Sequence, residues 1–286
     1  MIPQRELERA LQLAPAFVAP PWCQRLYRAR WLLLISALFG LALWDIDIDW
    51  SRLLYWSDVT GNLLLGFLRP TPGSELSVIG AALIETVAMA VAGTFLAIAI
   101  AVPLGFLGAK TLISGFLAHA AIRFTFDVLR AIPALVWTII MIRAVGLGPA
   151  AGVIALALAE APYLAKLFAE LIENADRRPV VALRSVGAGP IQALRFGLVS
   201  QVLPSFLGLS LYIFEVNVRA AAALGLVGAG GIGELIEERM GVAAYDELSF
   251  LIVVLLVLVA FVDEFSSRLR KSILVADPDR RPGSKR

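Results

Sequence analysis

Seven ionisable side chains lie within or at the ends of apolar stretches, and they are the residues best placed to do chemistry. They are Glu85, Asp127, Arg130, Glu160, Lys166, Glu215 and Arg219. A charge at the centre of a lone membrane helix costs about 2.5–3.5 kcal/mol, so these side chains should face a protein interior. They could line a polar route in which Arg130 and Arg219 tolerate an anion. They could instead be ion pairs that pin helices, such as Glu215 with Arg219 four residues later. The sequence leaves both possibilities open.

The sequence offers little for covalent or metal chemistry. It has one histidine, His119, and one cysteine, Cys23, which exclude an internal disulfide and argue against a His/Cys metal site. The acids are scattered singly, with no nucleophile and base at a useful spacing. No Gly-x-x-x-x-Gly-Lys-Ser/Thr phosphate loop is present, so ATP and Mg²⁺ would be bound by another chain. We therefore expect a chain that is not an enzyme and carries no metal or cofactor of its own.

The glycine-rich run Leu226 to Gly233 contains the pattern Gly-x-Gly-x-x-Gly. In a dinucleotide site this pattern follows a strand and begins a helix in a βαβ unit. Here it follows an apolar helix and no strand pattern surrounds it, which argues against a nucleotide site. Glycines permit unusual backbone angles and close packing. We expect a flexible break at the outer end of a membrane span, acting as part of a gate.

These residues must be positioned by membrane helices. Hydrophobic residues make up 59% of the 286 residues, and the mean hydropathy is +0.81. Soluble domains have about 45–50% apolar residues, and a spanning helix needs about 20 of them in a row. The pattern predicts an all-α integral membrane protein with about six spans. We place them near 27–44, 79–107, 116–145 with an interruption at 130–133, 148–168, 202–223 and 249–267.

Basic residues near span ends indicate a multi-pass protein with both termini in the cytoplasm. Arg25, Arg28 and Arg30 precede the first span, and Arg268, Arg270 and Lys271 close the last. Arg143, near the outer end of the third span, argues mildly against this topology. We also expect a short amphipathic helix over Glu6–Val18 and an outer-surface or re-entrant helix over Asn62–Leu68.

A cationic connector runs from Asn174 to Pro204 between two spans. It carries four arginines and no acid after Asp176. Pro179 can begin a short helix, residues 187–190 break it, and residues 191–199 can form a second. A structured, cationic connector suits docking of a soluble partner. The alternative is a solvated loop that only sets topology.

Several stretches in order over about residues 79–270 resemble one family, the permeases of phosphonate and phosphite ABC importers. They include Glu85-Thr86, Pro103-Leu-Gly105, Arg130-Ala-Ile-Pro133, Val145-Gly-Leu-Gly-Pro149, Lys166-Leu-Phe-Ala-Glu170, Gln201-Val-Leu-Pro204, Asn217-Val-Arg219 and Leu224 to Gly233. The connector also resembles the coupling loop of such permeases. Gly187 stands at the family's glycine, whereas Val181 replaces its acid and Ser200 its proline.

The resemblance implies a type I ABC permease fold in the bacterial inner membrane. The permease core would be residues 79–270, after an N-terminal segment and first span in 1–78 and before a cytoplasmic tail in 271–286. The implied partners are two ATPase subunits, a periplasmic substrate-binding protein, and a second permease subunit, as a homodimer or with a similar chain. Membrane lipid would surround the spans, and we expect no nucleic-acid partner.

The resemblance also implies roles for individual residues. A coupling helix seated in an ATPase groove would include Arg184, Ser185, Val186, Gly187, Ala188, Gly189, Pro190 and Ile191. A translocation path or gate would include Glu85, Arg130, Glu215, Asn217, Arg219, Gly228, Gly230 and Gly231.

The function implied is ATP-driven import of a small phosphorus oxyanion: a phosphonate, phosphite or hypophosphite. An alternative is the same machine for another small solute, such as methionine or a sulfonate. A secondary transporter working without ATP would show inverted repeats and broken helices in both halves, which the sequence does not.

Overall fold

The computed structural model describes residues 22–45, 61, 65–66, 70–73, 76–110 and 115–275. Regular structure in these ranges is entirely helical, which confirms the predicted class. The chain divides into two units, Met1–Gly61 and Asn62–Arg286. The helix expected at Glu6–Val18, most of that expected at Asn62–Leu68, and the tail from residue 276 lie outside the described residues.

In the first unit the described residues form one helix, α3 (Trp22–Asp45). Its 24 residues extend about 36 Å, enough to cross a bilayer. Its apolar stretch, Arg30–Trp44, is shorter than a full span, and its large side chains are exposed. The first predicted span therefore stays a prediction.

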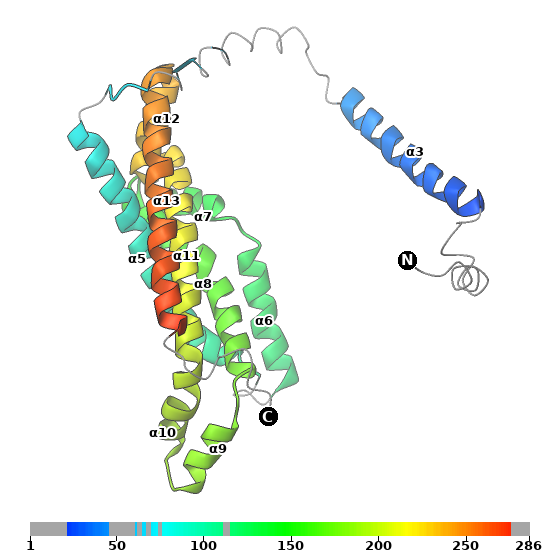
Figure 1. The fold of residues 1–286 in the computed structure, drawn as a ribbon, viewed down its shortest axis with the longest axis vertical. Coiled ribbons are helices and arrows are strands. Elements are labelled where there is room, and N and C mark those ends of the chain that lie inside the picture. The colour runs from blue at the N-terminus through cyan, green and yellow to red at the C-terminus, as the bar shows by residue number, and fades with distance from the viewer. Residues whose placement is uncertain are drawn as a thin grey trace, which may run out of the picture. The chain divides into compact units, whose positions relative to one another are not determined.

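The second unit is built on four long apolar helices: α5 (Leu76–Gly108), α8 (Pro149–Glu173), α11 (Ser200–Leu224) and α13 (Tyr245–Val275). Figure 1 shows them running alongside one another. Each belongs to a stretch long and apolar enough to cross a membrane, and they correspond to the second, fourth, fifth and sixth predicted spans.

The third predicted span is a bent pair of helices and not a straight crossing. Helices α6 (Phe116–Arg130) and α7 (Ala134–Val145) meet at 82°. The break falls at the interruption predicted from the sequence, because Pro133 lacks an N–H and disfavours a helical conformation in the residue before it. The described residues thus supply four spans, or five if the bent pair counts as one, where about six were expected.

Small residues let α5 and α8 pack closely. A Cβ at Gly93 would lie 2.9 Å from the Cβ of Leu156, and one at Gly105 would lie 2.8 Å from the Cβ of Phe168. Ala97, Ala101, Ala161 and Ala165 are buried in the same core. Close backbone approach through glycine and alanine is how membrane helices gain packing contacts when the surroundings are as apolar as their side chains.

The two ends of this bundle carry different structures. One end, which we call the connector end, carries α9 (Arg178–Ser185), α10 (Pro190–Leu194) and the wide helical turn η1 (Arg195–Val199) that leads into α11. The other end carries a second wide turn, η2 (Gly225–Ala229), followed by α12 (Ile232–Gly241) (Figure 1). The predicted arrangement of short helix, turn and short helix is confirmed in the connector.

Candidate functional site

The connector is a tightly turned hairpin of two short helices. Asp176 begins it by accepting a hydrogen bond of 2.9 Å from the backbone N–H of Arg178 through its carboxylate. Gly187 has a φ of +89°, a conformation that favours glycine, and turns the chain between α9 and α10. The N–H of Gly189 donates to the side-chain carbonyl of Gln192 at 3.2 Å and so fixes the start of α10.

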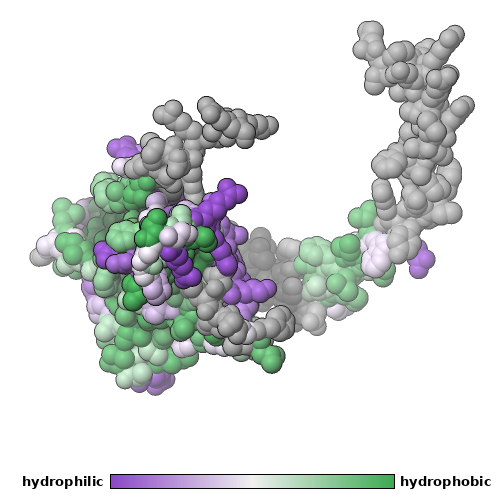
Figure 2. Space-filling view, turned by 90° about the horizontal axis from the view of Figure 1, so that it is seen from below, coloured by the Kyte–Doolittle hydropathy of each residue, from purple (hydrophilic) through white to green (hydrophobic). Residues whose placement is uncertain are grey.

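The tip of the connector exposes apolar side chains among arginines. Val186 and Ile191 are 81% and 79% exposed, although both are large and hydrophobic. Arg184 and Arg195 lie in the same hairpin and are also exposed. Figure 2, which views the bundle from this end, shows hydrophilic and hydrophobic side chains intermixed. An exposed apolar patch with a polar rim is typical of a surface that docks another protein.

Two contacts within the connector join the chain around α9 to η1 and the start of α11. Gly197 packs so closely on α9 that a Cβ there would lie 2.9 Å from the Cα of Val180. The side-chain amide of Gln201 donates to the carbonyl of Asp176 at 3.0 Å. A displacement of the connector would therefore move η1 and the start of α11.

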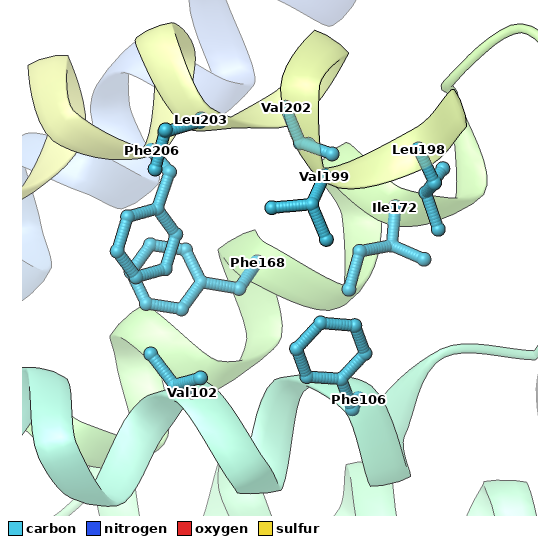
Figure 3. Close-up of a pocket in the computed structure, with 9 residues that line it drawn as sticks. All are labelled: Val102, Phe106, Phe168, Ile172, Leu198, Val199, Val202, Leu203 and Phe206. Carbon is cyan, nitrogen blue, oxygen red and sulfur yellow. The ribbon is translucent and has the colours of Figure 1, made fainter. Parts of the chain in front are cut away.

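An apolar hollow of about 150 Å³ lies beside η1 and the start of α11. Every side chain drawn around it in Figure 3 is hydrocarbon; they are Val102, Phe106, Phe168, Ile172, Leu198, Val199, Val202, Leu203 and Phe206. The hollow lies between α5, α8 and α11 (Figure 3). The side chains beside η1 therefore leave some space unfilled.

At the opposite end of the bundle, the glycine run interrupts the helix, as predicted, and packs against α5. Gly228, Gly230 and Gly231 have φ values of 96°, 88° and 72°, which L-residues rarely adopt. The N–H of Ile232 donates to the Thr86 hydroxyl at 2.9 Å. A Cβ on Gly230 would lie 2.6 Å from a carboxylate oxygen of Glu85. We call residues 225–233 the glycine loop.

The glycine loop also contacts the turn before α8. The N–H of Gly148 donates to the carbonyl of Gly228 at 3.1 Å. Four predicted path or gate residues, Glu85 and the three glycines, are thus brought together. Thr86, which anchors the loop, was not among the predicted site residues, although it lies in the stretch that carries the family resemblance.

Glu215 and Arg219 belong to an ion-pair network between α11 and α13. Glu215 lies 2.9 Å from Arg270 and 3.9 Å from Arg219, and Arg219 lies 3.2 Å from Asp263. The geometry favours the helix-pinning interpretation for this pair. The sequence shows the spacing of Glu215 and Arg219 on one helix, but it does not show that α13 places Asp263 and Arg270 opposite them.

Asn217 is fully buried and links α11 to α5. Its amide donates to the Thr94 hydroxyl at 2.8 Å, and Thr94 in turn donates to the carbonyl of Ala90 at 2.7 Å. The Asn217 carbonyl oxygen has no hydrogen-bond partner in the described part of the chain. Asn217 therefore stabilises the packing of α11 against α5 through a buried hydrogen bond.

We expect Asn217→Ala to lower the melting temperature of the detergent-solubilised protein by several degrees. The substitution removes an interhelical hydrogen bond that contributes about 1 kcal/mol and leaves the Thr94 hydroxyl with one partner fewer. Thr94→Val should produce a similar loss, and the double variant should lose less than the sum of the two. Additive losses would contradict the direct link between the two side chains.

Arg130 lies apart from the glycine loop, the ion-pair network and Asn217, at the bend between α6 and α7. Its guanidinium carbon is 4.7 Å from the ring centroid of Tyr163. Both side chains line a hollow that Glu160 and Tyr212 also line. The predicted path or gate residues thus occupy four separate places: the glycine loop, the network, the buried amide and the bend.

The comparisons with known proteins agree with this architecture. Residues 101–273 match the family described as binding-protein-dependent transport system inner membrane component. The phosphite transport system permease protein PtxC of Stutzerimonas stutzeri is 39% identical over 189 residues, 66% of this chain and 69% of that protein. The phosphate-import permease protein PhnE of Mycolicibacterium smegmatis is 36% identical over 190 residues, 66% of this chain but 36% of that protein.

The fold has a solved counterpart. An inward-facing structure of the MetNI methionine ABC transporter matches with a TM-score of 0.59 and 24% identity, covering 70% of this chain and 99% of the matched chain. At that identity the likeness is one of fold.

The bundle and its connector are those of the membrane component of an ABC importer. The chain belongs to the binding-protein-dependent transport system inner membrane component family. It is accordingly a multi-pass inner-membrane permease subunit, and its system includes a substrate-binding protein and an ATPase.

Proposed function

We propose that this permease imports a small phosphorus oxyanion: a phosphonate, phosphite or hypophosphite. The observation that carries the proposal is the 39% identity to a phosphite permease over two thirds of the chain. The phosphate-import relative handles a related oxyanion. In such systems the binding protein selects the solute. Because the proposed solute is a phosphorus oxyanion, the permease must accept a small, strongly hydrated anion.

The connector is the proposed docking site for an ATPase subunit, and the two ATPase subunits of the complex would dock on the connectors of the two permease subunits. Residues Arg184 to Ile191 form its tip, with Val186 and Ile191 exposed and Gly187 turning the chain between the helices. A hairpin that is fixed at its base and apolar at its tip suits a groove on a folded partner. Contacts of η1 with α9, and of Leu198 in η1 with the apolar cluster that contains Ala169 and Ile172 of α8, provide a route by which movement of the ATPase would reach the bundle.

The proposed orientation places the connector end in the cytoplasm and the glycine loop on the periplasmic side. The connector arginines support it, because basic residues near span ends are retained in the cytoplasm. We propose a type I permease core over residues 79–270, six spans with both termini cytoplasmic, and a second permease subunit, identical or similar, completing the pore. The glycine loop with Glu85 would form part of its outer gate.

Uptake of labelled phosphite, a phosphonate and hypophosphite in cells with and without this chain tests the proposal. We expect loss of uptake of at least one of them on deletion, and the same loss after ATP depletion of cells that carry the chain. Unchanged uptake of all three would overturn the phosphorus assignment and direct the search to sulfonates and amino acids. Uptake that needs the chain but survives ATP depletion would overturn the coupling to an ATPase.

A further inference from the structure

The bend between α6 and α7 opens onto a hollow of about 270 Å³. Its lining combines the end of α6, the break, the start of α7, and side chains of α8 and α11; it includes Arg130, Pro133, Ala134, Glu160, Tyr163 and Tyr212. Glu160 and Tyr163 lie near the middle of α8, and Tyr212 lies near the middle of α11. The hollow is therefore midway between the two ends of the bundle. Non-helical backbone at membrane depth is tolerated where it lines such a cavity.

Arg130, which is exposed, differs from the other cations of the bundle. In the described part of the chain, Arg123, Lys166, Arg219 and Arg270 each form an ion pair with a carboxylate. Arg130 forms none there, and its guanidinium lies over the face of the Tyr163 ring. Stacking on an aromatic ring orients a guanidinium and leaves its N–H groups available. An arginine without an ion-pair partner on the wall of a hollow is available to bind an anion.

The start of α7 adds positive potential to the same hollow. Helix α7 has 12 residues, its N-terminal residue Ala134 lines the hollow, and no side chain caps that end. The first N–H groups of a helix lack partners within it, and the helix dipole is positive there. Half-helix ends of this kind hold anionic substrate groups in other transporters.

Glu160 has the opposite effect. It lines the same hollow and, when ionised, attracts Arg130 from beyond ion-pair distance. A carboxylate beside Arg130 balances part of its charge when the hollow is empty and repels an entering anion. Conduction requires a site that binds well enough to admit an ion and weakly enough to release it.

We propose that this hollow is an anion subsite of the translocation path, which a phosphorus oxyanion occupies between delivery and release. The Arg130 guanidinium binds two of its oxygens, the α7 N-terminus faces it, and the tyrosine hydroxyls complete its coordination. Glu160 repels the bound anion and so shortens the time that the anion stays in the hollow. The inference rests on the proposed function. It assigns anion binding to Arg130 and not to Arg219, whose charge Asp263 already neutralises in the ion-pair network.

Transport by the complete importer in proteoliposomes, with its ATPase subunits and binding protein, tests the subsite. At saturating binding protein, Arg130→Gln should lower the rate of labelled phosphite uptake roughly tenfold, because a charge-assisted hydrogen-bond pair is lost. Arg130→Lys should retain more, since it keeps the charge without the bidentate geometry. Arg143→Gln, at the other end of α7, is the matched control and should transport normally. Wild-type uptake by Arg130→Gln would overturn the subsite and leave the importer function standing.

A second measurement does not depend on turnover. Cys23 is the only cysteine in the chain, so Ala134→Cys in a Cys23→Ser background places one thiol on the hollow. An anionic methanethiosulfonate reagent should modify it several-fold faster than a cationic one, Arg130→Gln should remove that preference, and excess phosphite should slow modification. A preference independent of Arg130, or a thiol that neither reagent reaches, would contradict the proposal. Absence of transport of phosphite, a phosphonate and hypophosphite by the wild type would instead overturn the proposed function.

Discussion

Replacement of Gly187 by tryptophan is expected to abolish binding of the ATPase subunits and leave the permease folded. Gly187 turns the connector tip with a φ of +89°, and a Cβ there would meet nothing within 4 Å. An indole would therefore project from the tip, between the exposed side chains of Val186 and Ile191. It would block insertion into a groove, and the left-handed conformation would add strain of about 1–2 kcal/mol. We expect ATP-dependent uptake to fall below detection.

Co-purification of tagged ATPase subunits with the permease measures this effect directly. Gly241→Trp is the matched control, because it places the same side chain in open space at the opposite end of the bundle. Both variants should elute from size exclusion as folded protein, and only Gly187→Trp should lose the ATPase. Normal complex formation by Gly187→Trp would remove the coupling assignment from the connector.

The second large effect is expected at Gly231, where alanine should reduce uptake at least tenfold without loss of the ATPase subunits. Its φ of +72° disfavours any L side chain, and a Cβ would overlap the Thr86 hydroxyl. The glycine loop would be displaced from α5, and the hydrogen bond from Ile232 to Thr86 would be broken. On the proposal that the glycine loop forms part of the outer gate, this displacement would prevent closure behind the substrate.

A double variant distinguishes this contact from general instability. Thr86→Ala removes the overlapping hydroxyl, so Gly231→Ala combined with Thr86→Ala should regain part of the lost uptake. Gly241→Ala, in open space, should transport as the wild type does. If the double variant is as impaired as Gly231→Ala, the overlap with Thr86 is not the cause of the loss.

The helical class and the connector could be predicted from the sequence because their signals are local. Long apolar runs determine α5, α8, α11 and α13, and Pro179 with the Gly187–Pro190 stretch determines the hairpin. The break at Pro133 could be predicted for the same reason. The angle of the break could not be predicted, because an 82° bend depends on how α6 and α7 each pack against α8.

The site was predicted less completely, since its contacts join residues far apart in sequence. Asp263 and Arg270 complete the network only because α13 lies beside α11. Thr86 and Thr94 look like small filler residues in an apolar helix, yet each bonds another segment. The charges at Arg130 and Arg219 looked equivalent in sequence, and only their neighbours distinguish them.

The central claim is that this chain conducts a phosphorus oxyanion only when a separate ATPase acts on its connector. Purified permease, ATPase subunits and binding protein in proteoliposomes test it directly, with labelled phosphite and the binding protein on one side and ATP on the other. We predict that phosphite crosses only when all three proteins and hydrolysable ATP are present. Passage of phosphite without ATP, or at an unchanged rate when this chain is omitted, would contradict the account.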